Sequence, residues 1–247
     1  MKHIHRTVRR AQSGFTLVEM LVATTVAVFL LGGLIATLQS TRQAYSQQYE
    51  LAQLQDNQRL AMTIIAGVVE TAGYYPKPAT YSSASFMATG GAWTTAGQSV
   101  VGTANVTEPG DTLTVRYGSD IIDNVFDCRG HQNDTGVINT MVNTFKVVKD
   151  GAGISWLVCN DGTQDYQLVR DVTNMQVVYG VHLGPTTGSC TDTYLSSAQM
   201  VATPANWPLV CSVRVSLTFN NRVSLVQGGT LTITRTIAIM NTAGANT

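Results

Sequence analysis

The sequence predicts an α+β protein in which one long N-terminal helix packs on an antiparallel β-sheet. The chain has 247 residues and six prolines, but no proline lies between Met1 and Pro76, where apolar residues recur at helical spacing. After residue 110, apolar and polar residues alternate in short runs that Gly, Asn and Asp turn signals separate. Such alternation is typical of half-buried strands.

Composition excludes a basic nucleic-acid-binding domain, because charged residues make up only 12% and the formal net charge is zero. The zero hides an asymmetry. Residues 1–14 carry four basic side chains and no acidic one, and the remainder has 11 basic and 15 acidic side chains, a net charge of −4.

Residues 15–38 read as a membrane-spanning helix. Of these 24 residues, 19 are apolar or glycine. A helix of this length rises about 36 Å, which is enough to cross the hydrocarbon core. The positive-inside rule then keeps the basic residues 1–14 in the cytoplasm and puts the chain from Gln39 onward outside the inner membrane.

A glycine and a glutamate make this segment unusual. Gly14 precedes the apolar run, whereas a signal peptide carries its small residue after it. Cleavage after Gly14 removes only the basic leader and makes Phe15 the new terminus, one helical turn from Glu19. A carboxylate at the centre of a span costs about 2.5–3.5 kcal/mol, so a partner is expected, such as the amino terminus of a neighbouring subunit. The alternative is an uncleaved signal anchor whose Glu19 reaches the interface.

The run "GFTLVEMLVA" (14–23) resembles the prepilin signature of type IV pilins and pseudopilins. The resemblance covers the first 40 or so residues of the chain. It implies that a prepilin peptidase cleaves after Gly14 and methylates the new terminus at Phe15. It also implies that Glu19 guides docking into the growing filament, and that the fold is type IV pilin-like.

Three later runs, "FDCRG", "LVRDVTNMQVVYGV" and "NWPLVCSVRVSL", resemble the PilW class of minor type IV pilins. This class is related to the J-type pseudopilins of type II secretion. The resemblance implies a minor pilin that helps to prime pilus assembly in a tip complex and supports pilus biogenesis and twitching motility. Two alternatives remain open, which are a J-type pseudopilin and a membrane-tethered periplasmic binding module or enzyme without a filament role.

The implied partners are the prepilin peptidase, the major pilin, other minor pilins, the inner-membrane assembly platform and membrane lipid, with no nucleic acid. The chain is expected to be a single-pass inner-membrane protein with a periplasmic C-terminal domain before assembly, and a pilus component at the cell surface afterwards. Four parts follow: a cytoplasmic leader (1–14), the transmembrane and assembly helix (15–38), its amphipathic continuation (39–73) and a periplasmic β-rich domain (74–247).

Helical spacing predicts one helix from Phe15 to Ala72, about 87 Å long, which Gly73 and Pro76 end. The segment from Tyr74 to Gly110 is rich in Gly, Ala, Ser and Thr and is expected to be a surface excursion. Strands are expected in seven later runs: 112–117, 144–149, 154–159, 166–170, 175–183, 212–219 and 231–239.

The four cysteines predict two disulfides that pin loops to the sheet, because an even count is usual in an exported domain. No pair has CxxC spacing, which argues against a zinc or thioredoxin-like site. Three pairings exist. Cys128–Cys159 and Cys190–Cys211 are favoured because each closes a local loop, with a contribution of roughly 3–4 kcal/mol per loop.

Candidate chemistry is sparse, and the sequence predicts neither an enzyme nor a cofactor. His131 shares a loop with Asp127, Cys128 and Asp134, but an oxidised Cys128 cannot act as a nucleophile. The turns "HQNDTG" and "NDGTQD" offer oxygen ligands without the calcium-loop pattern, so solvated turns and no metal site are expected. The three tryptophans are expected to pack in the core: Trp93, Trp156 and Trp207.

Overall fold

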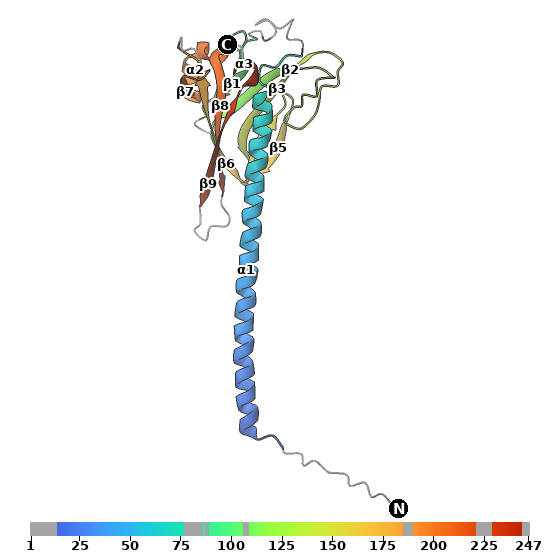
Figure 1. Ribbon diagram of the computed structural model, residues 1–247, viewed down its shortest axis with the longest axis vertical. Helices are drawn as coiled ribbons and strands as arrows, with labels where there is room; N and C mark the ends of the chain where they lie inside the picture. Colours follow the sequence, from blue (N-terminus) through green and yellow to red (C-terminus); the bar gives the residue numbers. More distant parts are fainter. Residues whose placement is uncertain are drawn as a thin grey trace, which may run out of the picture. The chain divides into compact units, whose positions relative to one another are not determined.

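The computed structural model describes residues 14–76, 86, 89–105, 109–184, 190–220 and 229–243. The chain divides into two compact units, 1–51 and 52–247. Figure 1 shows the elements along the chain: α1 (Leu17–Glu70), β1 (Val100–Thr103), β2 (Thr112–Ser119), β3 (Asn139–Lys149), β4 (Ser155–Asn160), β5 (Asp165–Arg170), β6 (Val172–Val181), β7 (Thr193–Ser196), α2 (Ser197–Ala202), the 3₁₀ helix η3 (Pro204–Leu209), β8 (Val210–Asn220), β9 (Thr230–Ala238) and α3 (Met240–Ala243).

Helix α1 begins after Thr16, whose hydroxyl accepts a hydrogen bond from the Glu19 backbone N–H at 3.3 Å. The helix ends at Glu70, and Gly73 follows in the left-handed region with φ 74°. The Gly73 N–H donates to the carbonyl oxygen of Arg116 on β2 at 3.0 Å. The predicted helix is therefore present, two residues shorter at each end.

The character of α1 changes along its length. Every side chain from Phe15 to Leu51 is exposed. In the second compact unit the helix turns one stripe towards a shared core; its buried side chains are Leu54, Ala61, Met62, Ile65, Ala66, Val68 and Val69. The amphipathic end of α1 thus belongs to the same compact unit as the strands.

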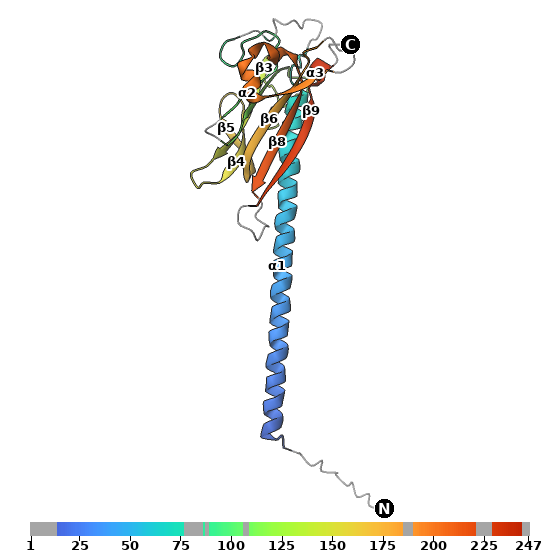
Figure 2. The ribbon, with the colours of Figure 1, turned by 90° about the vertical axis from the view of Figure 1, so that its left-hand side faces the viewer.

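The predicted antiparallel structure is present as two sheets. The first has the order β1-β2-β3-β4-β5 and the second the order β7-β6-β8-β9. Figure 2 shows β6, β8 and β9 side by side. The sheets meet at a parallel bridge between Gly110 and Met175, where the Asp111 N–H donates to the Met175 carbonyl oxygen at 2.7 Å.

All seven predicted strands are present, and most are longer than the sequence pattern indicated. The expectation of a surface excursion up to Gly110 is wrong at β1, since Val100 and Val101 are buried beside β2. β1 is too short for its alternation to be read. The strand expected at 175–183 ends earlier, since β6 stops at Val181 and Leu183 is exposed.

One core joins both sheets and the end of α1. Its largest fully buried side chains include Tyr117, Phe145, Leu157, Met175, Tyr179, Leu217, Phe219 and Ile65. Trp207 is buried in this core, with its ring 4.9 Å from that of Tyr179. Trp93 and Trp156 are half-buried. Arg235, which interrupts the apolar alternation of β9, is exposed on an edge strand.

Arg116 departs from the alternation of β2, because its pattern position predicts exposure and the residue is only 4% exposed. Its Nε donates to the Gln98 carbonyl oxygen at 2.6 Å and its Nη2 to the Phe86 carbonyl oxygen at 3.0 Å. The guanidinium carbon lies 4.1 Å from the centre of the Trp93 ring. Arg116 therefore fastens the chain that precedes β1 onto β2.

Candidate functional site

The predicted processing and assembly residues lie at the start of α1. Gly14 precedes the helix, and a side chain added there would meet nothing within 4 Å. Phe15 is exposed. Glu19 occupies the first helical turn, where the positive end of the helix dipole favours an anion. Both residues of the Gly14–Phe15 junction are therefore exposed.

Thr16 and Glu19 also form a local relationship that the sequence reasoning above did not use. The spacing Thr-x-x-Glu is a capping-box pattern, and the half in which Thr16 accepts from the Glu19 N–H is present. Met20 donates its N–H to the Thr16 carbonyl oxygen at 3.2 Å. The pattern is readable from the sequence and would have placed the helix start at Leu17.

By length and composition, α1 can cross a membrane. Its apolar stretch has a mean hydropathy of 2.3, and none of it is buried within the chain. An isolated protein in water does not leave so large an apolar surface uncovered. The first part of α1 is therefore built for a bilayer or for neighbouring apolar helices.

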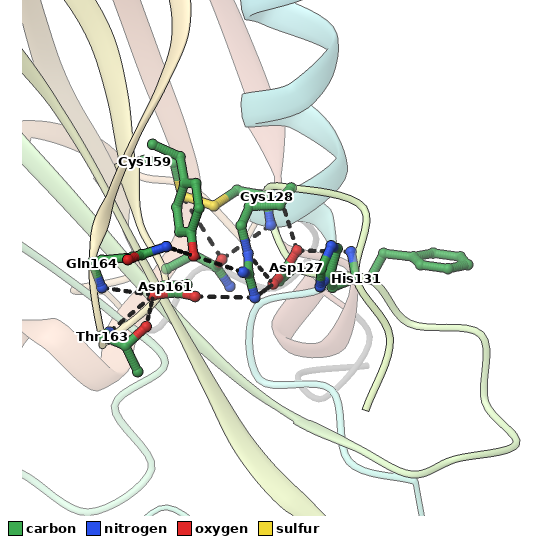
Figure 3. Close-up of polar contacts among 12 residues, drawn as sticks. Asp127, Cys128, His131, Cys159, Asp161, Thr163 and Gln164 are labelled. Atoms are coloured by element: carbon green, nitrogen blue, oxygen red, sulfur yellow. Dashed lines mark hydrogen bonds and ion pairs between the residues drawn. A yellow bond between two sulfur atoms is a disulfide. The ribbon is translucent and has the colours of Figure 1, made fainter. Parts of the chain in front are cut away.

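The second region of interest is the loop between β2 and β3, residues 120–138, which we call the 120–138 loop. The disulfide Cys128–Cys159 joins it to β4, with the two Cα atoms 6.5 Å apart (Figure 3). The other expected bond, Cys190–Cys211, is also present and ties the chain before β7 to β8. The pairing is the one favoured from the sequence.

Beside this disulfide, Asp127 organises the loop around its own carboxylate (Figure 3). Oδ1 accepts from the backbone N–H groups of Arg129 at 2.8 Å and His131 at 2.9 Å. Oδ2 accepts from the guanidinium of Arg129, at 2.9 Å from Nε and 2.7 Å from Nη2. Since the Asp127 side chain is 2% exposed, this ion pair is held largely out of water.

Arg129 extends the connection to the turn between β4 and β5. Its Nη2 lies 3.0 Å from Asp161 Oδ2, and its Nη1 donates to the Tyr166 hydroxyl at 2.8 Å. The guanidinium carbon also lies 4.6 Å from the centre of the Tyr166 ring. One arginine thus joins the 120–138 loop to both ends of the β4–β5 turn.

Asp161 is held in its charged form. Desolvation alone would raise the pKa of its carboxyl, but hydrogen bonds from Thr163 and Gln164 and the charge of Arg129 lower the pKa to about 2 (Figure 3). The Oδ1 atom accepts from the Thr163 N–H at 2.9 Å and the Gln164 N–H at 3.0 Å. The turn "NDGTQD", considered above for metal ligands, is closed around its own carboxylate.

The residues considered for catalysis do not form a reactive group. Cys128 is in a disulfide, and His131 reaches Asp127 through its main chain. Asp134 is exposed. Within the described ranges, no three His, Cys, Asp or Glu side chains are grouped as metal ligands would be.

Two residues that hold the 120–138 loop on the sheet, Asn143 and Tyr117, were not predicted from the sequence. Asn143, fully buried on β3, accepts from the Cys128 N–H at 3.0 Å and donates to the Tyr117 hydroxyl at 2.9 Å. Tyr117 in turn donates to the Phe126 carbonyl oxygen at 2.8 Å. The available signal was register, because Asn143 continues the inward positions of Phe145 and Val147.

Two family models match the chain. The prokaryotic N-terminal methylation motif matches residues 9–35, and the model of type IV pilus-assembly protein W, PilW, matches residues 144–236. Both matches support a type IV pilin-like protein of the PilW type. The match to the PilW model covers the strands from β3 to β9, and the match to the methylation motif covers the residues around the Gly14–Phe15 junction.

Other comparisons are distant. No curated protein matches the chain. Among solved structures, a type IV-like pilin from Thermus thermophilus shares 12% identity and a TM-score of 0.38, covering 77% of this chain and 97% of that one. This likeness is too low to carry an argument. Pilins are structural rather than catalytic proteins, and the N-terminal helix and motif indicate membrane anchoring and a pilus.

Proposed function

We propose that this PilW-type protein is a minor pilin that helps to prime type IV pilus assembly. It acts in a tip complex with other minor pilins and supports twitching motility. A prepilin peptidase removes residues 1–14 and methylates Phe15, and the remainder then stands in the inner membrane with residues 52–247 in the periplasm. The cysteine content of this part suits an oxidising compartment.

The observation that supports the proposal best is the contrast within α1. Its first part is apolar and exposed at every residue to Leu51, whereas its end packs into a finished core. The first part therefore needs an external partner along its whole length. A bilayer meets that need before assembly and the apolar helices of neighbouring subunits meet it afterwards, so one surface serves both states.

Glu19 can define the axial position at which the apolar part of α1 packs against a neighbouring subunit. A carboxylate in an apolar environment is costly unless a cation is near, and the methylated amino terminus of an adjacent subunit supplies one. We infer that Glu19 makes docking into the filament base favourable only at one axial position. The capping contact with Thr16 uses the backbone N–H of Glu19 rather than its carboxylate oxygens.

Deletion of the coding region, with complementation by the full chain, tests the function. The expected result is loss of surface pili and of twitching, with secretion of type II substrates unchanged. An epitope-tagged full chain should appear in sheared filaments at far lower amount than the major pilin. Loss of secretion with normal pili would instead assign a J-type pseudopilin, and neither defect would reject both filament roles.

A further inference from the structure

Four large apolar side chains of the 120–138 loop face solvent. Ile122 is 80% exposed, Val137 59%, and Ile121 and Phe126 48% each. Single exposed apolar residues are ordinary, but a group of them on one ordered loop marks an interaction site. This loop contributes none of its residues to a sheet beyond one isolated bridge between Phe126 and Gln132.

Hydrogen bonds hold the backbone of this loop in place. Asn133, which is buried, donates from Nδ2 to the carbonyl oxygens of Ser119 at 2.6 Å and Val137 at 2.7 Å. Gln132 Nε2 donates to the Ile121 carbonyl oxygen at 2.6 Å. With the Cys128–Cys159 bond below, the loop is ordered before any partner arrives. Binding to an ordered loop loses little conformational entropy.

A groove continues the apolar surface. It has a cavity volume of about 480 Å³ and lies between the end of α1 and residues 124–130, all within the unit 52–247. Ile64 and Val68 line it from the helix, and Phe126 lines it from the loop. Gly67 leaves the groove open, since a side chain built there meets nothing within 4 Å. The groove is wide enough for one large apolar side chain of a partner.

The charges around this surface are negative. Asp120, Asp123 and Asp134 lie on the loop, and Asp134 is exposed. The arginine of the loop, Arg129, is engaged by Asp127 and Asp161. In a symmetric contact between two copies of the chain, these carboxylates would face one another, which is unfavourable. An anionic membrane surface would be repelled for the same reason.

We propose that the 120–138 loop and the adjoining groove are the docking surface for a different pilin-like subunit. That subunit presents a large apolar side chain to the groove and surrounds it with Lys or Arg side chains. The proposal rests on the proposed minor-pilin function and adds to it which face of the domain meets the neighbour and what chemistry that neighbour offers.

A photo-crosslinking amino acid at Ile122 in the full chain, expressed in cells that make pili, tests this surface. Val201, an exposed apolar residue on α2, is the matched control position. Irradiation should join position 122, but not position 201, to a protein that mass spectrometry identifies by its own prepilin N-terminus. The contacted peptide should carry Lys or Arg.

Charge reversal tests complementarity. Asp134→Lys, which changes the charge of the loop by +2, should reduce the crosslinked product from position 122 at least fivefold. Gln176→Lys, which adds one positive charge at an exposed position of β6, should leave it unchanged. Peptide mapping without reduction confirms that Cys128–Cys159 is intact in both variants. If Asp134→Lys and Gln176→Lys behave alike, the charge argument fails.

Other outcomes overturn the proposal. Crosslinking of position 122 to a second copy of the chain, to lipid alone, or to nothing while the chain is processed and present in filaments removes this docking surface but leaves the minor-pilin function standing. If the chain is neither processed nor found in filaments, the proposed function itself fails. Equal products from positions 122 and 201 would mean that crosslinking reports proximity without a docking surface.

Discussion

The side-chain amide of Asn143 donates a hydrogen bond to the hydroxyl of Tyr117 at 2.9 Å, and both residues are fully buried. Asn143 also accepts a hydrogen bond from the Cys128 N–H, and the Tyr117 hydroxyl donates one to the Phe126 carbonyl oxygen. The Asn143 side chain on β3 thus provides hydrogen-bond partners for a side chain on β2 and for the backbone of the 120–138 loop. Burial raises the pKa of Tyr117 well above its ordinary value, so its hydroxyl keeps its proton as a donor.

Replacing Asn143 with leucine should therefore destabilise the protein by about 1–3 kcal/mol, because the Cys128 N–H and the Tyr117 hydroxyl lose buried partners. Thermal unfolding of the full chain in detergent measures this loss, and hydrogen exchange should locate it in residues 126–130. Thr140→Leu, at an exposed site on the same strand, is the control. Equal stability of the two variants would refute the role of Asn143.

Gly102 on β1 lies directly against Tyr179 on β6, and an added Cβ would overlap the Tyr179 hydroxyl and the Thr112 carbonyl oxygen. Gly102→Ala should cost about 1–3 kcal/mol of stability through this overpacking. Gly151→Ala, where a side chain meets nothing within 4 Å, should have a far smaller effect. Chemical denaturation of both variants of the full chain compares them, and similar midpoints would contradict the predicted overlap.

Asp161 predicts a stability change in acid. Its folded-state pKa of about 2 lies below the unfolded value. Its contribution is therefore present above about pH 4 and is lost as the pH falls from about 4 to 2. At pH 7, Asp161→Asn should lower the free energy of unfolding by about 1–2 kcal/mol, which a lower melting temperature reports. The difference from the parent should vanish near pH 2. Asp134→Asn is the control; a difference for Asp161→Asn that persists unchanged at pH 2 would exclude this account.

Processing should occur between Gly14 and Phe15. Mass spectrometry of the N-terminal peptide from cells with an active prepilin peptidase should find N-methylated phenylalanine, and cells without the peptidase should retain Met1. Gly14→Val should block cleavage, because a branched side chain then stands beside the scissile bond. An intact Met1 terminus in peptidase-positive cells, or a cut after Leu38, would show that the segment is a signal anchor or signal peptide.

Glu19→Ala should leave membrane insertion intact, because it removes a charge from the apolar segment. Incorporation into sheared filaments should fall at least tenfold. Glu50→Ala, which removes the same side chain from the exposed polar part of α1, should not change incorporation. Processing is checked in the same strains, so that a peptidase defect is not taken for a docking defect. Normal filament number and motility with Glu19→Ala would reject the docking role.

The sequence predicted those features that depend on periodicity or on local spacing. The helix and seven strands follow from patterns along the chain, and the disulfides pair cysteines close in sequence. Features that depend on contacts between distant segments were not readable. Arg116 looked solvent-exposed because its cover comes from Phe86, Trp93 and Gln98. Asn143 was overlooked because its partners lie in another strand and a loop.

Strand β1 was not predicted because it is short. Four residues carry too little alternation to distinguish a buried edge strand from a loop. The Asp127–Arg129–Asp161 connection was equally invisible. The turn of Asp161 was expected to be solvated, but its carboxylate pairs with Arg129 from a different loop. Arg129 also pairs with Asp127, two residues before it.

The two disulfides also join the cysteines in the order in which they occur, first with second and third with fourth. In a chain that crosses the membrane from its N-terminus, Cys128 and Cys159 emerge together before Cys190 and Cys211 do. An oxidant that joins thiols on arrival then makes only native bonds, so maturation needs no disulfide reshuffling. Each sheet is locked by its own bond as it emerges, and the five-stranded sheet can mature while β8 and β9 are still on the other side of the membrane.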